Sequence, residues 1–264
     1  MNKNIKILLF FLTLSLLLSS CSKKPEKKST AYEKRENAPQ NLNKIYENTN
    51  LILKDIEEIS KVSVETEQEE VKLNEENSKS KEKSNKESKE EKLKKLWKGI
   101  DKSIENIHKD WNNYEIEGMK KIGNTNSIDK FEESLNDVTV SIENRDHLNI
   151  INNGSKVLFH ISPFFDIYKD EIKGDISRIK YYVYQGHILG DKGEKEKAIN
   201  FISQGEANLN SIRQKIENDK NKLKTLEKLT LSLNDMKKSI EKESANLFKI
   251  KRDIVLNNLK KLEE

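Results

Sequence analysis

Residues 93–114 read LKKLWKGIDKSIENIHKDWNNY. Through this stretch apolar residues recur in alternating steps of four and three, at Leu93, Trp97, Ile100, Ile104, Ile107, Trp111 and Tyr114. Such steps return to one face of an α-helix, so the pattern predicts an amphipathic helix that is three heptads long. Both tryptophans of the chain lie on this stripe. We expect them to pack in a helical core rather than to form a binding site.

The same rhythm occurs on both sides of this stretch. Upstream it predicts an amphipathic helix over residues 42–64, and downstream it predicts helices over residues 127–142 and 148–161. Pro163 is expected to end or kink the last of these, because Ser162 before it is pushed out of the helical region. With only 9 glycines and 3 prolines in 264 residues, the chain has few turn-makers. The predicted fold class is therefore all-α, with an elongated helical bundle over residues 93–264.

The C-terminal third contains the strongest turn signal, Gly190–Gly193. Around it, Gly186 and Ala198 stand twelve residues apart, a spacing that resembles the helix-turn-helix unit of a tetratricopeptide repeat. Only one such unit occurs, so we interpret it as a single tight αα-hairpin inside a bundle. Residues 194–264 carry two apolar stripes that are slightly out of phase, which places a helix break near Asn218–Asn221.

Residues 65–92 separate the first predicted helix from the bundle and are nearly devoid of apolar side chains. Only Val71 and Leu73 interrupt a mixture of glutamate, lysine, serine and asparagine. Glutamate–lysine pairs four residues apart favour a helix, but a helix without an apolar face is marginal in water. The segment is predicted to be either a solvated charged linker or a fraying helical stalk.

The N-terminal residues have the pattern of an export signal. Lys3 and Lys6 precede an apolar run that begins with Ile7–Leu12 and continues to Leu18, and small residues follow before Cys21. A charged start, a short apolar segment and small residues before a cleavage point are typical of a secretory signal peptide. Residues 1–20 are therefore the predicted signal peptide.

Cys21 is the only cysteine of the chain. Leu18-Ser19-Ser20-Cys21 resembles the lipobox of bacterial lipoproteins, which implies cleavage before Cys21 and lipidation of its thiol. The alternative is an ordinary cleaved signal followed by an incidental free cysteine. The segment 21–41 contains two prolines and several lysines without apolar periodicity, so it is predicted to be a flexible tether of roughly 25 Å.

Composition argues against several classes of function. The formal net charge is +4, and it falls when Lys3 and Lys6 are removed with the signal; the remaining basic residues interleave with glutamates. Nucleic-acid binding, which needs a basic face, is therefore not expected. The four histidines fall in four different predicted elements, and no phosphate loop or nucleophile motif occurs. We expect no enzyme activity, no metal and no cofactor.

One aromatic-rich group is the best candidate for a partner-binding surface in the sequence. It comprises Phe164, Phe165, Tyr168, Tyr181 and Tyr184. Exposed aromatic side chains frequently anchor protein–protein interfaces. The alternative is that these rings pack in the core of the bundle.

The whole chain resembles the outer-surface lipoproteins of Borrelia-type spirochaetes. The resemblance rests on the Leu18–Cys21 lipobox, the Lys/Asn-rich tether and a helical body rich in Lys, Glu, Asn and Ile. The segment Leu158–Ser162, followed by helical residues to the end, is also similar to the virulence-associated paralogues that include complement-regulator-binding lipoproteins. The resemblance implies an α-helical antigen, lipid-anchored at the outer membrane and facing outward. It also implies binding of a host or vector protein, such as a complement regulator or a matrix component.

Two alternatives to this function remain open. The stripes in residues 42–64 and 93–114 could pair with those of another copy, which would make the chain a self-associating coiled-coil envelope lipoprotein. The lipid-anchored chain could also face the periplasm, because a short motif does not reveal its sorting.

Overall fold

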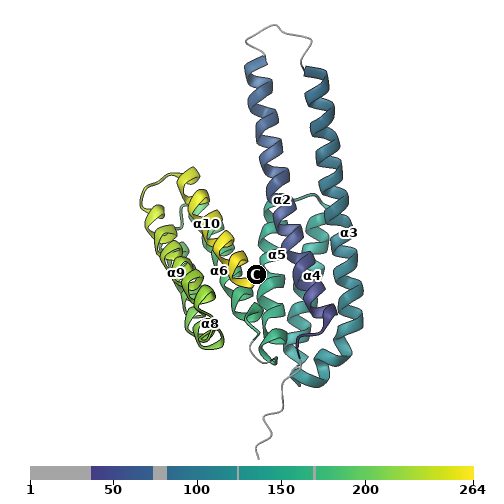
Figure 1. Cartoon of the computed structure of the whole chain (residues 1–264). Coiled ribbons are helices and arrows are strands. Elements are labelled where there is room, and N and C mark those ends of the chain that lie inside the picture. Colours follow the sequence, from purple (N-terminus) through teal and green to yellow (C-terminus); the bar gives the residue numbers. More distant parts are fainter. Residues whose placement is uncertain (1–36, 74–81, 124, 169–170) are drawn as a thin grey trace, which may run out of the picture. The chain divides into compact units, whose positions relative to one another are not determined.

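The computed structural model describes residues 37–73, 82–123, 125–168 and 171–264 (Figure 1). In this part of the chain all regular structure is helical and no strand occurs, as the all-α prediction requires. The predicted signal peptide, Cys21 and most of the tether lie outside the described residues. The helices are α2 (Gln40–Leu73), α3 (Glu82–Ile122), α4 (Thr125–Glu143), α5 (His147–Asp166), α6 (Lys173–Asp191), α7 (Lys195–Glu206), α8 (Leu209–Lys215), α9 (Lys220–Ile240) and α10 (Ala245–Glu263).

Helices α2 and α3 pack side by side over much of their length (Figure 1). The apolar stripes that the sequence shows are the surfaces by which they pack into the bundle: Ile52 and Ile56 of α2 and Ile100 and Ile107 of α3 are all buried. The charged segment 65–92 is helical at both ends, since α2 continues to Leu73 and α3 begins at Glu82. Residues 74–81 of that segment lie outside the described part.

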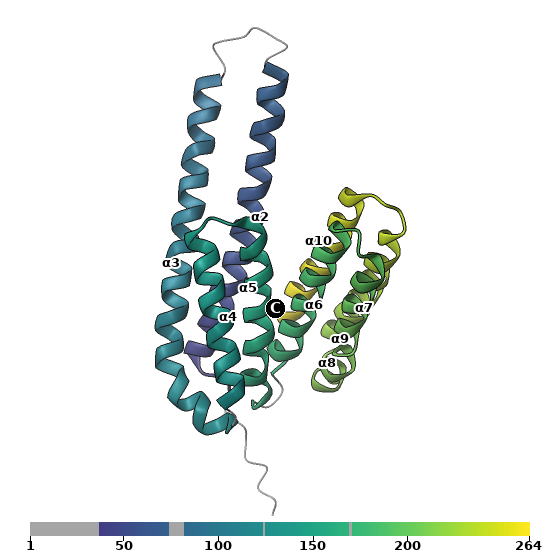
Figure 2. The same cartoon turned by 180° about the vertical axis from the view of Figure 1, so that it is seen from behind.

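Two apolar cores organise the described helices. The first is formed by α2, α3, α4 and α5, with Tyr184 of α6, and the second by residues of α6 to α10 together with Ile172. Figure 2 shows the second group from behind: α7 contacts α6 and α9, and α10 contacts α6 and α9. Leu256 of α10 packs against both cores. Helix α6 belongs to the second group and also packs closely on α5 of the first.

The αα-hairpin that the sequence predicts is formed by α6 and α7. A side chain at Gly186 would place its Cβ 2.7 Å from Cγ1 of Ile202 and 3.2 Å from the carbonyl oxygen of Ala198. Contacts below 3 Å are not tolerated without a shift of one helix, so the small residue sets the close approach of α6 to α7. The turn between them contains Gly193 at φ 78°, a conformation that glycine adopts without strain.

Helix α5 continues for three residues beyond Pro163, so this proline does not end it. Proline has no N–H to donate to the carbonyl four residues earlier, which here belongs to Phe159. The hydroxyl of Ser162 donates a hydrogen bond to that carbonyl oxygen at 2.7 Å and replaces the missing donor. The sequence therefore placed the end of this helix about one turn too early.

The C-terminal segment has more breaks than expected. A break does occur at the predicted place, where α8 ends at Lys215 and Asp219 caps α9. Two others were not predicted: one between α7 and α8, and one after Ile240, where Glu243 takes φ 52° and Ser244 caps α10. The second break turns α10 back against α9, which buries Leu233 and Val255 together.

Candidate functional site

Four of the five aromatic residues proposed to bind a partner lie in the first core. Phe164, Phe165, Tyr168 and Tyr184 are all buried. The ring of Phe164 meets those of Trp111, Tyr114 and Phe131 at centroid distances of 5.3, 5.9 and 5.9 Å. The prediction of an exposed surface at these four positions is therefore wrong. Phe164 and Phe165 lie on α5, which packs against α2, α4 and α6, and Tyr168 and Tyr184 are buried in the same core. The alternative, core packing, is what the structure shows.

Tyr181 has a different environment. It is half-buried, and its ring lies 4.6 Å from that of Phe159 and 5.2 Å from that of Tyr182. Phe201 of α7 completes the group, at 6.4 Å from Tyr181 and 6.1 Å from Tyr182. We call Phe159, Tyr181, Tyr182 and Phe201 the aromatic face. Periodicity did not single it out, because its members come from α5, α6 and α7.

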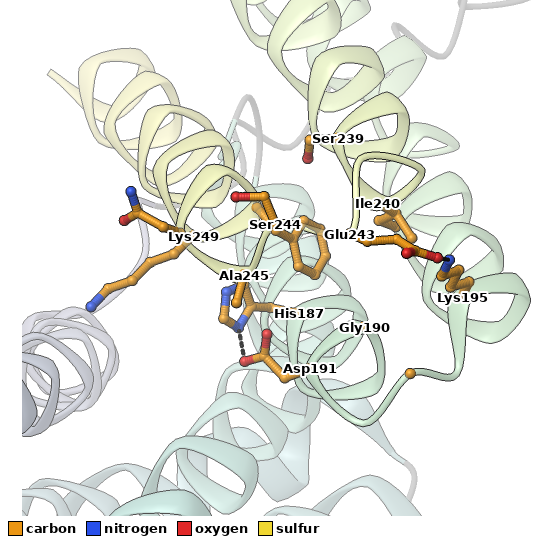
Figure 3. A pocket seen from close by; sticks show the side chains of 13 residues that line it. His187, Gly190, Asp191, Lys195, Ser239, Ile240, Glu243, Ser244, Ala245 and Lys249 are labelled. Carbon is orange, nitrogen blue, oxygen red and sulfur yellow. Dashed lines mark hydrogen bonds and ion pairs between the residues drawn. The ribbon is translucent and has the colours of Figure 1, made fainter.

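A surface pocket of about 570 Å³ lies between the α6–α7 turn and the α9–α10 turn (Figure 3). Nδ1 of His187 lies 3.1 Å from a carboxylate oxygen of Asp191, one helical turn away, and the imidazole stacks on Phe248 at 4.9 Å. A side chain at Gly190 would place its Cβ 2.3 Å from the Phe248 ring, so glycine lets that ring approach α6.

The two serine hydroxyls of this pocket are engaged with the backbone. Ser239 donates its hydroxyl to the carbonyl oxygen of Met236, and the hydroxyl of Ser244 accepts the N–H of Leu247 as a helix cap. Nε2 of His187 is buried without a hydrogen-bond partner in the described part of the chain. The pocket therefore contains an imidazole that lies against a carboxylate, and each of its two serine hydroxyls forms a hydrogen bond with the backbone of its own helix end.

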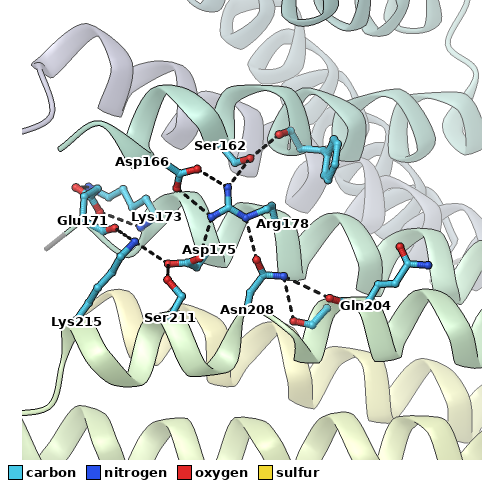
Figure 4. A network of polar contacts seen from close by, with 12 residues as sticks. Ser162, Asp166, Glu171, Lys173, Asp175, Arg178, Gln204, Asn208, Ser211 and Lys215 are labelled. Carbon is cyan, nitrogen blue, oxygen red and sulfur yellow. Dashed lines mark hydrogen bonds and ion pairs between the residues drawn. The ribbon is translucent and has the colours of Figure 1, made fainter. Parts of the chain in front are cut away.

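A polar network ties α5, α6 and α8 together (Figure 4). The carboxylate of Asp175 is buried and accepts hydrogen bonds from Arg178, Lys215 and Ser211 at 2.8, 2.7 and 2.9 Å. Arg178 also forms two hydrogen bonds to Asp166, at 2.7 and 2.9 Å. Each charged group has an opposite partner, as a buried charge requires. The network therefore fixes α5, α6 and α8 relative to one another.

A second buried cluster lies where α2, α6 and α10 meet. The ammonium of Lys180 donates to Tyr46, Asn50 and Glu263, each at 2.8 Å. The hydroxyl of Tyr46 also donates to Glu263. Burial lowers the pKa of Lys180 and raises the pKa of Tyr46 well above its ordinary value. The cluster connects the first and last described helices and is satisfied internally.

A further ion pair connects α2 and α10. Nη2 of Arg252 lies 3.1 Å from a carboxylate oxygen of Glu57 and 2.6 Å from one of Asp253. Burial raises the pKa of Glu57, although the Arg252 charge opposes the shift. Sequence patterns did not reveal these partners, because Glu57 and Arg252 are far apart in the chain.

Within the described ranges, no three side chains of histidine, cysteine, aspartate or glutamate are grouped so that they could hold a metal ion. None of the helices in those ranges combines the length and the apolar character needed to cross a bilayer.

Two histidines give the domain a predicted pH dependence. Burial lowers the pKa of His108 and of His160, so the folded state binds their protons at lower pH than the unfolded chain does. Their contribution to stability is complete above the ordinary histidine pKa of about 6.5 and is lost as the pH falls below it. We expect the double variant His108→Gln/His160→Gln to lose less unfolding free energy than the wild type between pH 7.5 and pH 5. Urea unfolding of both proteins at pH 7.5 and at pH 5 measures the loss of unfolding free energy. Equal losses in the variant and the wild type would contradict the prediction.

The fold and these sites define an all-α protein with internally satisfied polar clusters, a surface pocket beside His187 and a half-exposed aromatic face. Comparison with known proteins adds no relative: no family model, no curated protein and no solved structure matches the chain.

Proposed function

We propose that this protein is a bacterial lipoprotein, anchored in the outer membrane by acyl chains on Cys21, whose helical domain faces outward. The observation that carries the proposal is the N-terminal pattern, in which Lys3 and Lys6, an apolar run and Leu18-Ser19-Ser20 lead to the only cysteine of the chain. A single acyl chain gives weak, reversible attachment, whereas several chains anchor a protein stably. The resemblance to Borrelia-type surface lipoproteins supports the same assignment.

The proposed role of the domain is to bind a host or vector protein without catalysing a reaction. A non-catalytic role is supported by the sequence, which contains no phosphate loop and no nucleophile motif. The self-associating coiled coil receives less support. Most positions of its apolar stripes on α2 and α3 are already buried within one chain, with Ile56 and Ile107 almost inaccessible to solvent, so those positions are not free to pair with a second copy.

Replacement of Cys21 tests the anchor. We expect cells fed an alkyne-tagged palmitate to label the wild-type protein and leave Cys21→Ser unlabelled, because the chain offers no other thiol for acylation. The wild type should partition into the detergent phase of a Triton X-114 extract, and the variant into the aqueous phase or the medium.

The matched control for this experiment is Ser22→Ala, which changes the next residue and keeps the thiol. It should be labelled like the wild type. Equal labelling of Cys21→Ser and the wild type, or an unlabelled wild type, would remove the proposed anchor.

A further inference from the structure

The aromatic face is a group of rings outside both apolar cores. Phe159, Tyr181, Tyr182 and Phe201 are each half-buried and belong to neither core. Their rings contact one another across α5, α6 and α7, with centroid distances between 4.6 and 6.4 Å. Core packing is therefore not the reason why four aromatic side chains gather here. Half-buried aromatic groups are rigid and offer apolar area to a partner at a small entropic cost.

The two tyrosine hydroxyls in this face remain available. Neither Tyr181 nor Tyr182 forms a hydrogen bond through its hydroxyl within the described residues, and neither oxygen is buried. A tyrosine whose ring is packed and whose hydroxyl reaches solvent can bind apolar and polar groups of a partner at once. Tyrosine is also among the residue types enriched at the energetic centres of protein interfaces.

The border of the face towards α4 is positively charged. His160 lies beside Phe159, at 5.3 Å between ring centroids; burial lowers the pKa of its imidazole, and the charges of Lys130 and Lys156 act in the same direction. The negative charge of Glu133 has the opposite effect on this pKa. With His160 neutral, the two lysines and Glu133 together carry one net positive charge. Lys156 donates to an amide oxygen, and neither lysine forms an ion pair with a carboxylate in the described part of the chain.

The charges on the other borders are balanced. On α6, Arg178 is paired with Asp166 and Asp175, and on α7, Lys197 is paired with Glu194. The border formed by Lys130 and Lys156 is therefore the side of the face where a partner's carboxylate would gain an ion pair without displacing one.

We propose that the aromatic face and this basic border bind an acidic, partly apolar segment of a partner protein. Apolar side chains of the segment would pack on the four rings, and its carboxylates would approach Lys130 and Lys156. The inference rests on the proposed function, because it names the surface by which the anchored domain holds its partner. The rings are half-buried rather than protruding, which favours a protein segment over insertion into a bilayer.

A display experiment with a defined probe tests the inference. A random dodecapeptide library would be panned on the full chain purified in detergent. We expect the enriched peptides to carry net negative charge and at least one large apolar residue. Affinity for a synthetic copy should fall about tenfold or more in Tyr181→Ala/Phe201→Ala, as for the loss of central interface anchors. It should also weaken as salt is raised from 50 to 500 mM, because the ion pairs lie at an exposed border.

A second variant keeps the test valid if the alanine pair alters folding. Lys130→Glu/Lys156→Glu reverses two charges at the border and should also weaken binding about tenfold. Lys224→Glu/Lys228→Glu is its matched control, since it reverses two lysine charges on α9 that form no ion pair in the described part. It should bind like the wild type.

Three outcomes would overturn the inference: no enrichment, enrichment of neutral or basic peptides, or unchanged binding by the Lys130→Glu/Lys156→Glu variant. The same panning on Cys21→Ser separates this result from the anchor. Failure of acylation would leave peptide binding intact, and failure of peptide binding would leave acylation intact.

Discussion

Phe164→Ala is expected to lower the free energy of unfolding by about 3–5 kcal/mol, the range measured for large-to-small changes at fully buried aromatic positions. The ring is inaccessible to solvent and contacts Trp111 on α3 and Phe131 on α4. Its removal leaves a cavity between helices that cannot close without moving several rings. Urea unfolding, followed by far-UV circular dichroism and by tryptophan fluorescence, measures the loss.

Phe201→Ala is the matched control for this change. It removes the same side chain from a half-buried position outside both cores, so we expect a loss of about 1 kcal/mol or less. Equal losses for the two variants would contradict the assignment of Phe164 to the core and of Phe201 to a surface face. A fully stable Phe164→Ala protein would return Phe164 to the group of candidate binding residues.

Asp175→Ala should be about as damaging, with a loss of about 3–5 kcal/mol, because it removes one partner of a buried ionic network. Only 2% of the residue is exposed, and its two oxygens hold Arg178, Lys215 and Ser211. Without the carboxylate, Arg178 on α6 and Lys215 on α8 lose the negative charge that they share. Thermal and urea unfolding of the variant measure this loss.

Asp166→Ala is the control for the network, since Asp166 binds the same guanidinium of Arg178. The Asp166 side chain is 41% exposed, and Arg178 keeps Asp175 when it is removed, so we expect a loss near 1 kcal/mol. If Asp166→Ala were the more damaging of the two, Asp175 would not be the centre of the network.

Much of the fold follows from the sequence because apolar spacing reports which side of a helix is covered. The stripe from Leu93 to Tyr114 lies within α3, and its members Ile100 and Ile107 are buried. The break near Asn218–Asn221 was predicted from a phase shift between two apolar stripes, and the tight hairpin at Gly186 from a missing side chain. Such features depend on a few neighbouring residues, so the sequence reveals them.

Other features depend on long-range packing and could not be predicted in this way. The turn after Ile240 has no glycine, and Glu243 takes a positive φ that glutamate rarely adopts. This turn is fixed by the packing of α10 against α9 and α6. The positions of Phe164 and Tyr181 were equally unpredictable: both belong to aromatic-rich segments, and only the neighbours of α5 and α6 decide which ring is covered.

The measurement that tests the central claim most directly is the digestion of intact cells by proteinase K, with the full-length protein followed by immunoblotting. A lipoprotein anchored through Cys21 on the outer face should disappear within minutes, while a periplasmic marker in the same cells remains intact. Loss of the protein only after the outer membrane is permeabilised would contradict the account, because the helical domain would then face the periplasm and could not hold a host protein.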